Sequence, residues 1–161
     1  MTINKLWEPS AERIAQANIT AFAARIAQRY GADTASYGAL WRWSVDHKWD
    51  FWREIWEYGG VLGEQGARVL VDAEKMPGAQ WFPDASLNFA QNLLERRRAD
   101  DDGDSLVFWG EDKVQRRLSH AALHAMTSRV SAALAAHGIE AGDRIAAYMP
   151  NMPETIVAML G

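Results

Sequence analysis

Apolar residues in the first 60 positions recur every three to four residues, the spacing of helices that bury one face. One helix is predicted to begin at Asn18 or Thr20 and to end at Gly31. Its apolar face consists of Phe22, Ile26 and Tyr30. A short capped turn at residues 9–12 precedes it. This part of the chain is therefore expected to be mostly helical.

The next helical segment is rich in tryptophan. Spacings of 4, 4, 3 and 4 place five apolar residues on one helical stripe: Trp41, Val45, Trp49, Trp52 and Trp56. Ser36 is a natural N-cap for the segment, and Gly59-Gly60 would end it. The helix can break near Asp46-His47, where Asp46 would cap a second helix.

This stripe is expected to be buried, because each aromatic side chain removes about 150 to 250 Å² of surface from water. Core packing is favoured over the lining of a ligand pocket, since the spacing is helical. The charged residues between the stripe positions are expected to face water: Arg42, Asp50, Arg53, Glu54 and Glu57.

The pattern becomes less regular after residue 60. Residues 68–72 predict a short strand, whereas residues 76–83 contain two prolines and a glycine and are expected to be irregular. Ser86 is expected to cap a helix that Arg96-Arg97-Arg98 would close. The apolar residues of that helix are Leu87, Ala90, Leu93 and Leu94.

The acidic stretch 100–104 predicts a linker and the main domain boundary. Beyond it, residues 106–109 and 114–118 predict a hairpin. Ser119 is expected to cap a helix that ends at Gly138. One face of this helix carries Leu123, Met126, Val130, Leu134 and His137. An apolar strand at 144–149 and a helix beginning near Pro153 complete the chain.

The order strand, helix, strand, helix is typical of an α/β domain with a partly parallel sheet. The predicted fold class is therefore α/β: a helical N-terminal cap, residues 1–99, followed by the first strands and helices of a larger, incomplete domain, residues 100–161. The last apolar helix has only about eight or nine residues, against a mean of about 11 to 12. We therefore expect the chain to be the N-terminal fragment of a longer protein.

The charge balance excludes some functions. With 17 Lys and Arg against 21 Asp and Glu, the net charge is −4, which argues against a dedicated nucleic-acid binder. The absence of cysteine excludes disulfides, thiolate zinc sites and a cysteine nucleophile. Without a signal sequence or a membrane-spanning apolar stretch, a cytoplasmic protein with no membrane partner is expected.

Candidate catalytic motifs are weak. The glycine-rich stretch 59–66 follows a helix and lacks the G-x-G-x-x-G spacing, so it is interpreted as a connector. His120 and His124 lie four residues apart, but Ala121 stands where a zinc protease has glutamate. A calcium loop over 98–109 would need carboxylates at its first and last positions, which are Arg98 and Trp109. The sequence therefore offers no catalytic, cofactor-binding or metal-binding residue.

Three stretches resemble the AMP-forming acyl-CoA synthetases, and together they cover essentially the whole chain. The first comprises 7–10 with 40–45 and 51–52, the second runs through 76–83 and 87–94, and the third is 142–154. The first two are similar to the N-terminal cap of the acetyl- and acetoacetyl-CoA ligases, and the third is shared across the adenylate-forming superfamily. One departure is that His120 and Ala122 replace an aromatic residue and a glutamate at the start of a helix.

The resemblance implies an ATP-dependent ligase that joins a small acid to CoA through an acyl-adenylate, with Mg, ATP and CoA as cofactors. The stripe and residues 81–83 would clamp the cap onto the remainder of the chain. The family's catalytic residues correspond to no position before Gly161, so the 161 residues are expected to be inactive alone.

Three alternatives remain open. The cap resemblance favours acetoacetate, but acetate, propionate or another short acid would fit as well. A third interpretation is a non-catalytic module whose exposed aromatic surface binds a partner. The coding sequence beyond codon 161 distinguishes these classes.

Overall fold

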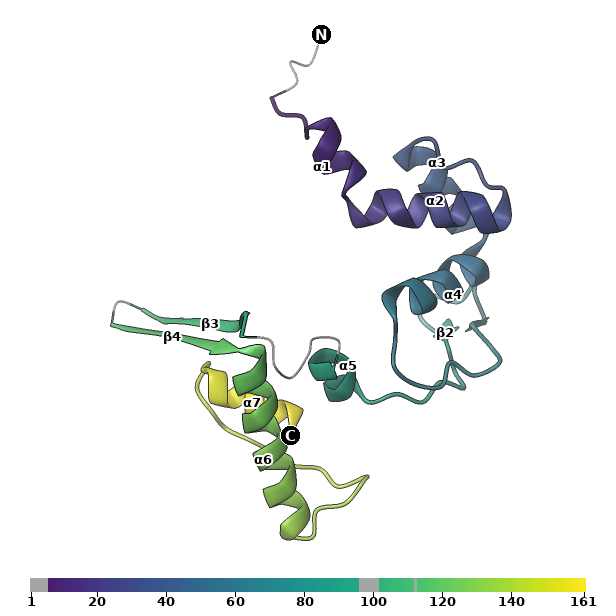
Figure 1. Cartoon of the computed structure of the whole chain (residues 1–161). Helices are drawn as coiled ribbons and strands as arrows, with labels where there is room; N and C mark the ends of the chain where they lie inside the picture. The colour runs from purple at the N-terminus through teal and green to yellow at the C-terminus, as the bar shows by residue number, and fades with distance from the viewer. Residues whose placement is uncertain (1–5, 96–101, 112) are drawn as a thin grey trace. The chain divides into compact units, whose positions relative to one another are not determined.

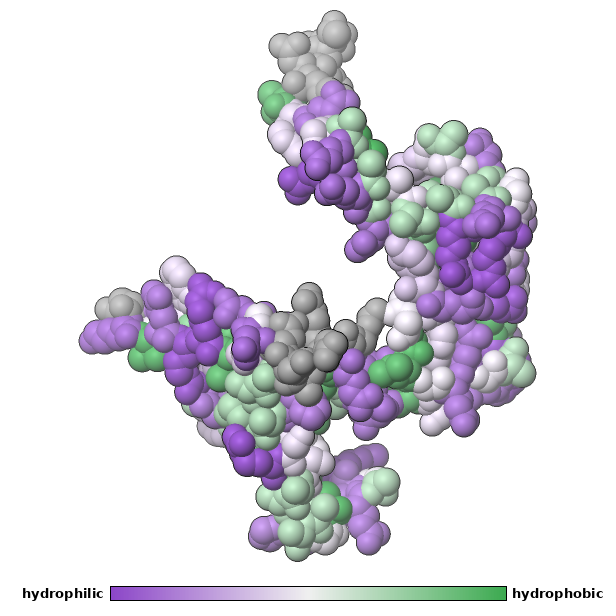
Figure 2. Space-filling view, in the orientation of Figure 1, coloured by the Kyte–Doolittle hydropathy of each residue, from purple (hydrophilic) through white to green (hydrophobic). Residues whose placement is uncertain are grey.

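The computed structural model describes residues 6–95, 102–111 and 113–161. They form two compact units, Met1–Ser86 and Leu87–Gly161, which are described separately here (Figure 1). Hydrophobic and hydrophilic residues are mixed over the visible face of each unit (Figure 2). Residues 100–101 of the expected linker and the helix end at 96–98 fall outside the described residues. The expected linker is wrong at Asp104, which begins a strand, and the boundary near residue 100 stays a prediction.

The first unit begins with two helices, α1 (Ala11–Ala15) and α2 (Asn18–Tyr30). The Ser10 side chain accepts a hydrogen bond of 3.2 Å from the Arg13 amide, which confirms the capped turn. Helix α2 ends at Gly31 with a φ of 63°, a left-handed conformation that glycine adopts without strain. The predicted bounds of this helix are confirmed.

Two further helices follow, α3 (Tyr37–Asp46) and α4 (Lys48–Gly59). The Ser36 side chain caps α3 through a 3.1 Å hydrogen bond from the Ala39 amide, as predicted. The break at residue 47 is confirmed as well. The prediction that Asp46 caps the second helix is wrong: His47 is the N-cap, and no side chain accepts a hydrogen bond there.

The tryptophan stripe is not the core of this unit. Trp41, Val45, Trp49 and Trp52 keep 39 to 51% of their surface exposed. The core uses another stripe of α3 and α4, which packs against α2. It consists of Phe22 and Ile26 of α2 and Leu40 and Trp43 of α3, with Phe51 and Ile55 of α4 beside them. Because α2 packs against that stripe, Trp49 and Trp52 are left on another side of α4.

The tryptophan side of α4 has its own neighbour. The Trp49 indole donates a 3.2 Å hydrogen bond to the Leu70 carbonyl, and the Trp52 and Trp81 ring centroids lie 5.3 Å apart. Trp56 contacts Phe82 in the same way, at 5.0 Å. Helix α4 therefore uses aromatic residues on two sides: one side packs against residues 69–82, and the other packs against α2.

Residues 61–86 form the irregular end of the first unit. Strands β1 (Leu70–Val71) and β2 (Gln80–Trp81) pair antiparallel, so the predicted strand at 68–72 is shorter than expected. The prediction that 76–83 is irregular throughout is wrong at Gln80–Trp81, because these two residues lie between the breakers and pair with β1. Gly66 has a φ of 75°, and a Cβ there would lie 2.5 Å from that of Asp84.

The second unit begins with α5 (Phe89–Glu95). The prediction that Ser86 caps this helix is wrong. Ser86 instead bridges Glu64 through backbone hydrogen bonds, whereas the Asn88 side chain accepts a 2.8 Å hydrogen bond from the Gln91 amide. Asparagine is as good an N-cap as serine, so local preference could not decide between them.

The predicted hairpin and the two helices after it are confirmed. Strands β3 (Asp104–Gly110) and β4 (Val114–Ser119) pair antiparallel, and α6 (His120–Ala136) and α7 (Pro153–Leu160) follow. The core joins Leu123 of α6 to Val157 and Leu160 of α7. Arg116 and Glu154 form a two-pronged ion pair, at 2.7 and 2.6 Å, that ties β4 to the first turn of α7.

The predicted strand at 144–149 is not present. These residues are exposed and lie outside any sheet in the part of the chain that the structure describes. A strand needs a neighbouring strand for its backbone groups, and here none lies beside them. Both described sheets are antiparallel, so the expected parallel pairing is wrong for these residues, while the helical region followed by short strands and helices is confirmed.

A stabilising substitution is expected at the start of α6. Ser119 accepts a 3.2 Å hydrogen bond from the Ala122 amide, and a glutamate at 122 would complete the reciprocal capping arrangement. Ala122→Glu should therefore stabilise α6 by about 0.5 kcal/mol, and slower amide hydrogen exchange in its first turn would show this. Ala125→Glu lies beyond the first turn and should change these rates little; equal protection by both variants would contradict the capping explanation.

Candidate functional site

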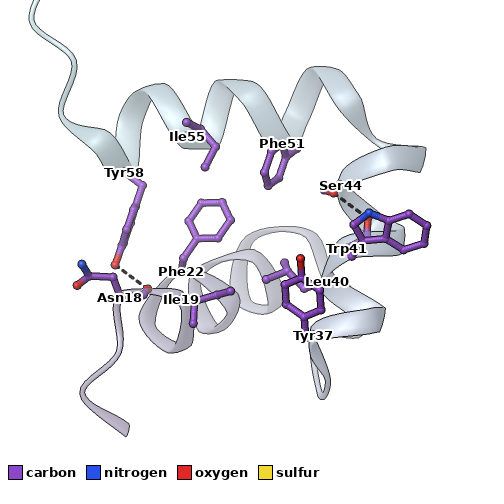
Figure 3. Close-up of a pocket in the computed structure, with 10 residues that line it drawn as sticks. All are labelled: Asn18, Ile19, Phe22, Tyr37, Leu40, Trp41, Ser44, Phe51, Ile55 and Tyr58. Carbon is purple, nitrogen blue, oxygen red and sulfur yellow. Dashed lines mark hydrogen bonds between the residues drawn. The ribbon is translucent and has the colours of Figure 1, made fainter. Parts of the chain in front are cut away.

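A cavity of about 420 Å³ lies between α2, α3 and α4 in the first unit. Figure 3 shows its lining, which comes from all three helices. From α2 come Asn18, Ile19 and Phe22; from α3 Tyr37, Leu40, Trp41 and Ser44; from α4 Phe51, Ile55 and Tyr58. The helical spacing that builds the core therefore also builds this cavity.

The floor of the cavity is aromatic and fixed. Phe22, only 5% exposed, meets Phe51 edge to face, with ring centroids 5.9 Å apart. Phe22 also meets the Tyr58 ring, at 5.2 Å. Such edge-to-face pairs hold each ring in place beyond the effect of burial alone. The cavity thus has a rigid apolar wall.

Polar groups sit at the margin of the cavity. The Tyr58 hydroxyl donates a 3.0 Å hydrogen bond to the Asn18 carbonyl, and the Ser44 hydroxyl donates a 2.7 Å bond to the Trp41 carbonyl (Figure 3). All ten lining residues are uncharged. A carboxylate or a phosphate would find no cation to replace its hydration, so the cavity does not fit an acid substrate or a nucleotide.

A charged cluster joins α2 to α4. Glu54, with none of its surface exposed, accepts a 2.6 Å hydrogen bond from Arg25 and a 3.0 Å bond from the Tyr30 hydroxyl. Arg29 lies 2.7 Å from Glu54, and both arginines bind Glu57 at 2.6 Å. The prediction that Glu54 faces water is wrong, because two arginines 25 and 29 residues earlier cover it with opposite charge.

The cluster shifts two pKa values. Burial raises the pKa of Glu54, but hydrogen bonds from Arg25 and Tyr30 and the charge of both arginines outweigh this, and the net pKa lies below its ordinary value of 4.5. Burial, followed by the hydrogen bond to Glu54, raises the pKa of Tyr30 to about 12. Glu54 therefore stays ionised, and Tyr30 protonated, near neutral pH.

Acid should weaken the first unit through Glu54. A carboxyl group whose folded pKa is lowered stabilises the fold above its unfolded pKa, and this contribution is lost as pH falls through the folded pKa. We expect the free energy of unfolding to decrease as the pH is lowered beyond about 4.5. In Glu54→Gln this decrease should be less steep. Tryptophan fluorescence reports it, since seven of eight tryptophans precede residue 86.

The matched control is Glu154→Gln. The Arg116 guanidinium also lowers the pKa of Glu154, but this pair lies in the second unit. Its loss should leave the fluorescence-monitored acid transition of the first unit unchanged. If Glu54→Gln left the acid dependence as steep as that of the unchanged chain, Glu54 would not be its source.

The structure assembles no metal site from the histidines of α6. Within residues 6–95, 102–111 and 113–161, no three His, Asp or Glu side chains lie close enough to hold an ion. The same described residues contain no helix with the length and hydropathy needed to cross a membrane. They also hold no glycine-rich loop preceding a helix after a strand, the arrangement that commonly binds phosphate.

Two families match consecutive parts of the chain. Residues 37–93 match the acetyl-coenzyme A synthetase N-terminus, and residues 95–161 match the AMP-binding enzymes. The chain is thus similar, over consecutive segments, to AMP-binding enzymes that carry this N-terminal segment, and the family resemblance of the sequence is confirmed.

Within that class, acetoacetyl-CoA synthetases are among the relatives. The chain is 47% identical over 155 residues to acetoacetyl-coenzyme A synthetase of Rhizobium meliloti (strain 1021), covering 96% of this chain and 23% of the relative. Its fold matches acetoacetyl-CoA synthetase from Streptomyces lividans with a TM-score of 0.80 and 41% identity, over 96% of this chain and 24% of that one. The chain therefore spans about a quarter of the length of these relatives.

Proposed function

We propose that the chain is the N-terminal quarter of an ATP-dependent acetoacetate–CoA ligase. The complete enzyme would convert acetoacetate, ATP and CoA to acetoacetyl-CoA, AMP and pyrophosphate, with Mg bound to ATP. The observation that carries this proposal is similarity to acetoacetyl-CoA synthetases over 96% of the chain, in both sequence and fold. Residues 1–99 would be the cap and residues 100–161 the start of the AMP-binding domain, in a cytoplasmic enzyme.

In this proposal the described residues have a structural role in the enzyme and contribute no catalytic group. The first unit has an uncharged cavity and a charged cluster whose members bind one another, so neither presents a free cation to a carboxylate or phosphate. The second unit contains a hairpin, two helices and an unpaired stretch at 144–149. This stretch is suited to pair with strands of a larger sheet, which the remainder of the chain would supply.

The 161-residue chain alone should therefore catalyse no ATP–pyrophosphate exchange with acetoacetate. Exchange above the level of a protein-free reaction would place catalytic groups within these residues and contradict the proposed division of labour. A chain that stays inactive does not yet identify the enzyme, so a second experiment addresses identity.

Identity is tested by the coding sequence beyond codon 161. If it continues into a loop rich in serine, threonine and glycine after a strand, the phosphate-binding part of an AMP-forming ligase is present. A stop codon at 162 would favour the non-catalytic module instead.

One observation supports a different acid as the substrate of the complete enzyme. The chain is also 31% identical, over 96% of its length, to malonamoyl-CoA synthetase of Penicillium aethiopicum. The proposed cap is therefore shared by ligases of different short acids. A panel of acetoacetate, acetate, propionate and malonamate, offered to the complete enzyme, decides among them through the ratio of their kcat/KM values.

A further inference from the structure

We propose that the cavity between α2, α3 and α4 binds a small neutral molecule: an aromatic ring that carries one hydrogen-bond acceptor. This inference concerns the first unit alone and does not depend on the proposed ligase activity. The cavity volume of about 420 Å³ lies within the range of small-molecule sites, roughly 300 to 1,000 Å³.

The lining decides the charge of the ligand. No lysine, arginine, histidine, aspartate or glutamate is among the ten lining residues. The arginines of α2 instead form ion pairs with Glu54 and Glu57, with nitrogen–oxygen distances of 2.6 Å. An ionised ligand would lose hydration without compensation, so the ligand is neutral.

The arrangement of the cavity walls indicates that the ligand contains an aromatic ring. Phe22 and Leu40 are 5 and 6% exposed and form a buried floor. The rings of Phe51 and Tyr58 stand against Phe22 at 5.9 and 5.2 Å and are held there by edge-to-face contact. A flat ring can continue this arrangement by offset or edge contacts, which a branched aliphatic group cannot.

One hydrogen-bond donor at the rim of the cavity indicates that the ligand carries a hydrogen-bond acceptor. The Tyr58 and Ser44 hydroxyls already donate to backbone carbonyls. Tyr37 is 74% exposed, and in the described part of the chain its hydroxyl has no hydrogen-bond partner. Figure 3 shows this hydroxyl directed toward the space between the helices. A ketone or ester oxygen at the outer end of the ring can accept a hydrogen bond from this hydroxyl.

Three related probes separate these requirements: acetophenone has the ring and the acceptor, ethylbenzene the ring alone, and benzoate the ring with a negative charge. Titration of the full 161-residue chain, followed by nuclear magnetic resonance of its aromatic side chains, should show saturable acetophenone binding with a Kd on the order of 1 mM. Ethylbenzene should bind several-fold more weakly, and benzoate at least about tenfold more weakly.

Two variants locate the site. Ile55→Trp fills the cavity and should weaken acetophenone binding at least about tenfold. Its matched control is Ile14→Trp, since Ile14 is exposed on α1 and does not line the cavity. Tyr37→Phe should leave ethylbenzene binding unchanged and remove the advantage of acetophenone. A thermal melt of each variant establishes that it is folded.

Several results would overturn the proposal. They are absence of binding by the folded chain up to the solubility of acetophenone, equal binding of benzoate, and undiminished binding by folded Ile55→Trp. A dimer in sedimentation that acetophenone does not dissociate, and that Ile55→Trp abolishes, would assign the cavity to a second copy of the chain and would overturn it as well. None of these results bears on ligase activity, so the two proposals fail independently.

Discussion

Replacing Ile26 with alanine is expected to destabilise the first unit by about 2 to 5 kcal/mol. Ile26 has none of its surface exposed and lies in the core with Phe22, Leu40 and Trp43. The substitution removes apolar surface that α2 buries and leaves a cavity that the neighbouring side chains of α3 and α4 cannot fill completely. Since small domains are stable by only about 5 to 15 kcal/mol, a large share of the stability of this unit would be lost.

Urea unfolding followed by tryptophan fluorescence measures this loss, because seven of the eight tryptophans lie in the first unit. Ile14→Ala is the matched control. Ile14 is 47% exposed, so its loss should cost no more than about 0.5 kcal/mol. Equal midpoints for the two variants would show that α2 does not form the core with α3 and α4.

Replacing Glu54 with alanine should destabilise the same unit by about 2 to 4 kcal/mol. The substitution leaves Arg25, Arg29 and Tyr30 without their shared acceptor at the junction of α2 and α4. The loss lies at or below the range for a fully buried pair, because side-chain exposures of 34 and 45% let the two arginines reach water.

Two further variants separate charge from packing. Glu54→Met should cost less than Glu54→Ala, because methionine refills the volume that the carboxylate leaves. Glu57→Ala removes a carboxylate that is 40% exposed and should cost about 1 kcal/mol or less. If Glu57→Ala cost as much as Glu54→Ala, the cluster would act through its total charge and not through the buried carboxylate.

Local signals in the sequence predicted the helices well. Serines 10, 36 and 119 cap their helices through their own side chains, and a cap depends on residues only three positions away. Gly31 and the break at residue 47 are local for the same reason. The hairpin at β3 and β4 is also local, since its two strands are neighbours in the chain.

The choice of the buried helix face could not be made locally. Two stripes of α3 and α4 have helical spacing, one through Trp41, Trp49 and Trp52 and one through Leu40, Trp43 and Phe51. Only the position of α2 decides which of them is covered. The burial of Glu54 has the same origin, because its partners lie 24 to 29 residues away in the sequence.

The same limit applies to the site. The ten cavity residues come from three helices, and no motif connects them along the chain. The sequence signal nearest to them is the tryptophan stripe between 41 and 56, whose helical spacing favours core packing over a ligand pocket. The strand expected at 144–149 was wrong for a related reason, since pairing depends on neighbours that the described residues do not provide.

The most direct test of the central claim is a chimera. Residues 1–161 replace the matching N-terminal quarter of the Streptomyces lividans acetoacetyl-CoA synthetase, and a second chimera uses the Rhizobium meliloti relative. Acetoacetate-dependent ATP–pyrophosphate exchange is compared with the parent enzymes and with versions that lack the quarter. If the chain is this segment of such a ligase, we expect exchange within about tenfold of the parents, a barrier difference of about 1.4 kcal/mol. Two folded chimeras that are no more active than the shortened enzymes would contradict the claim.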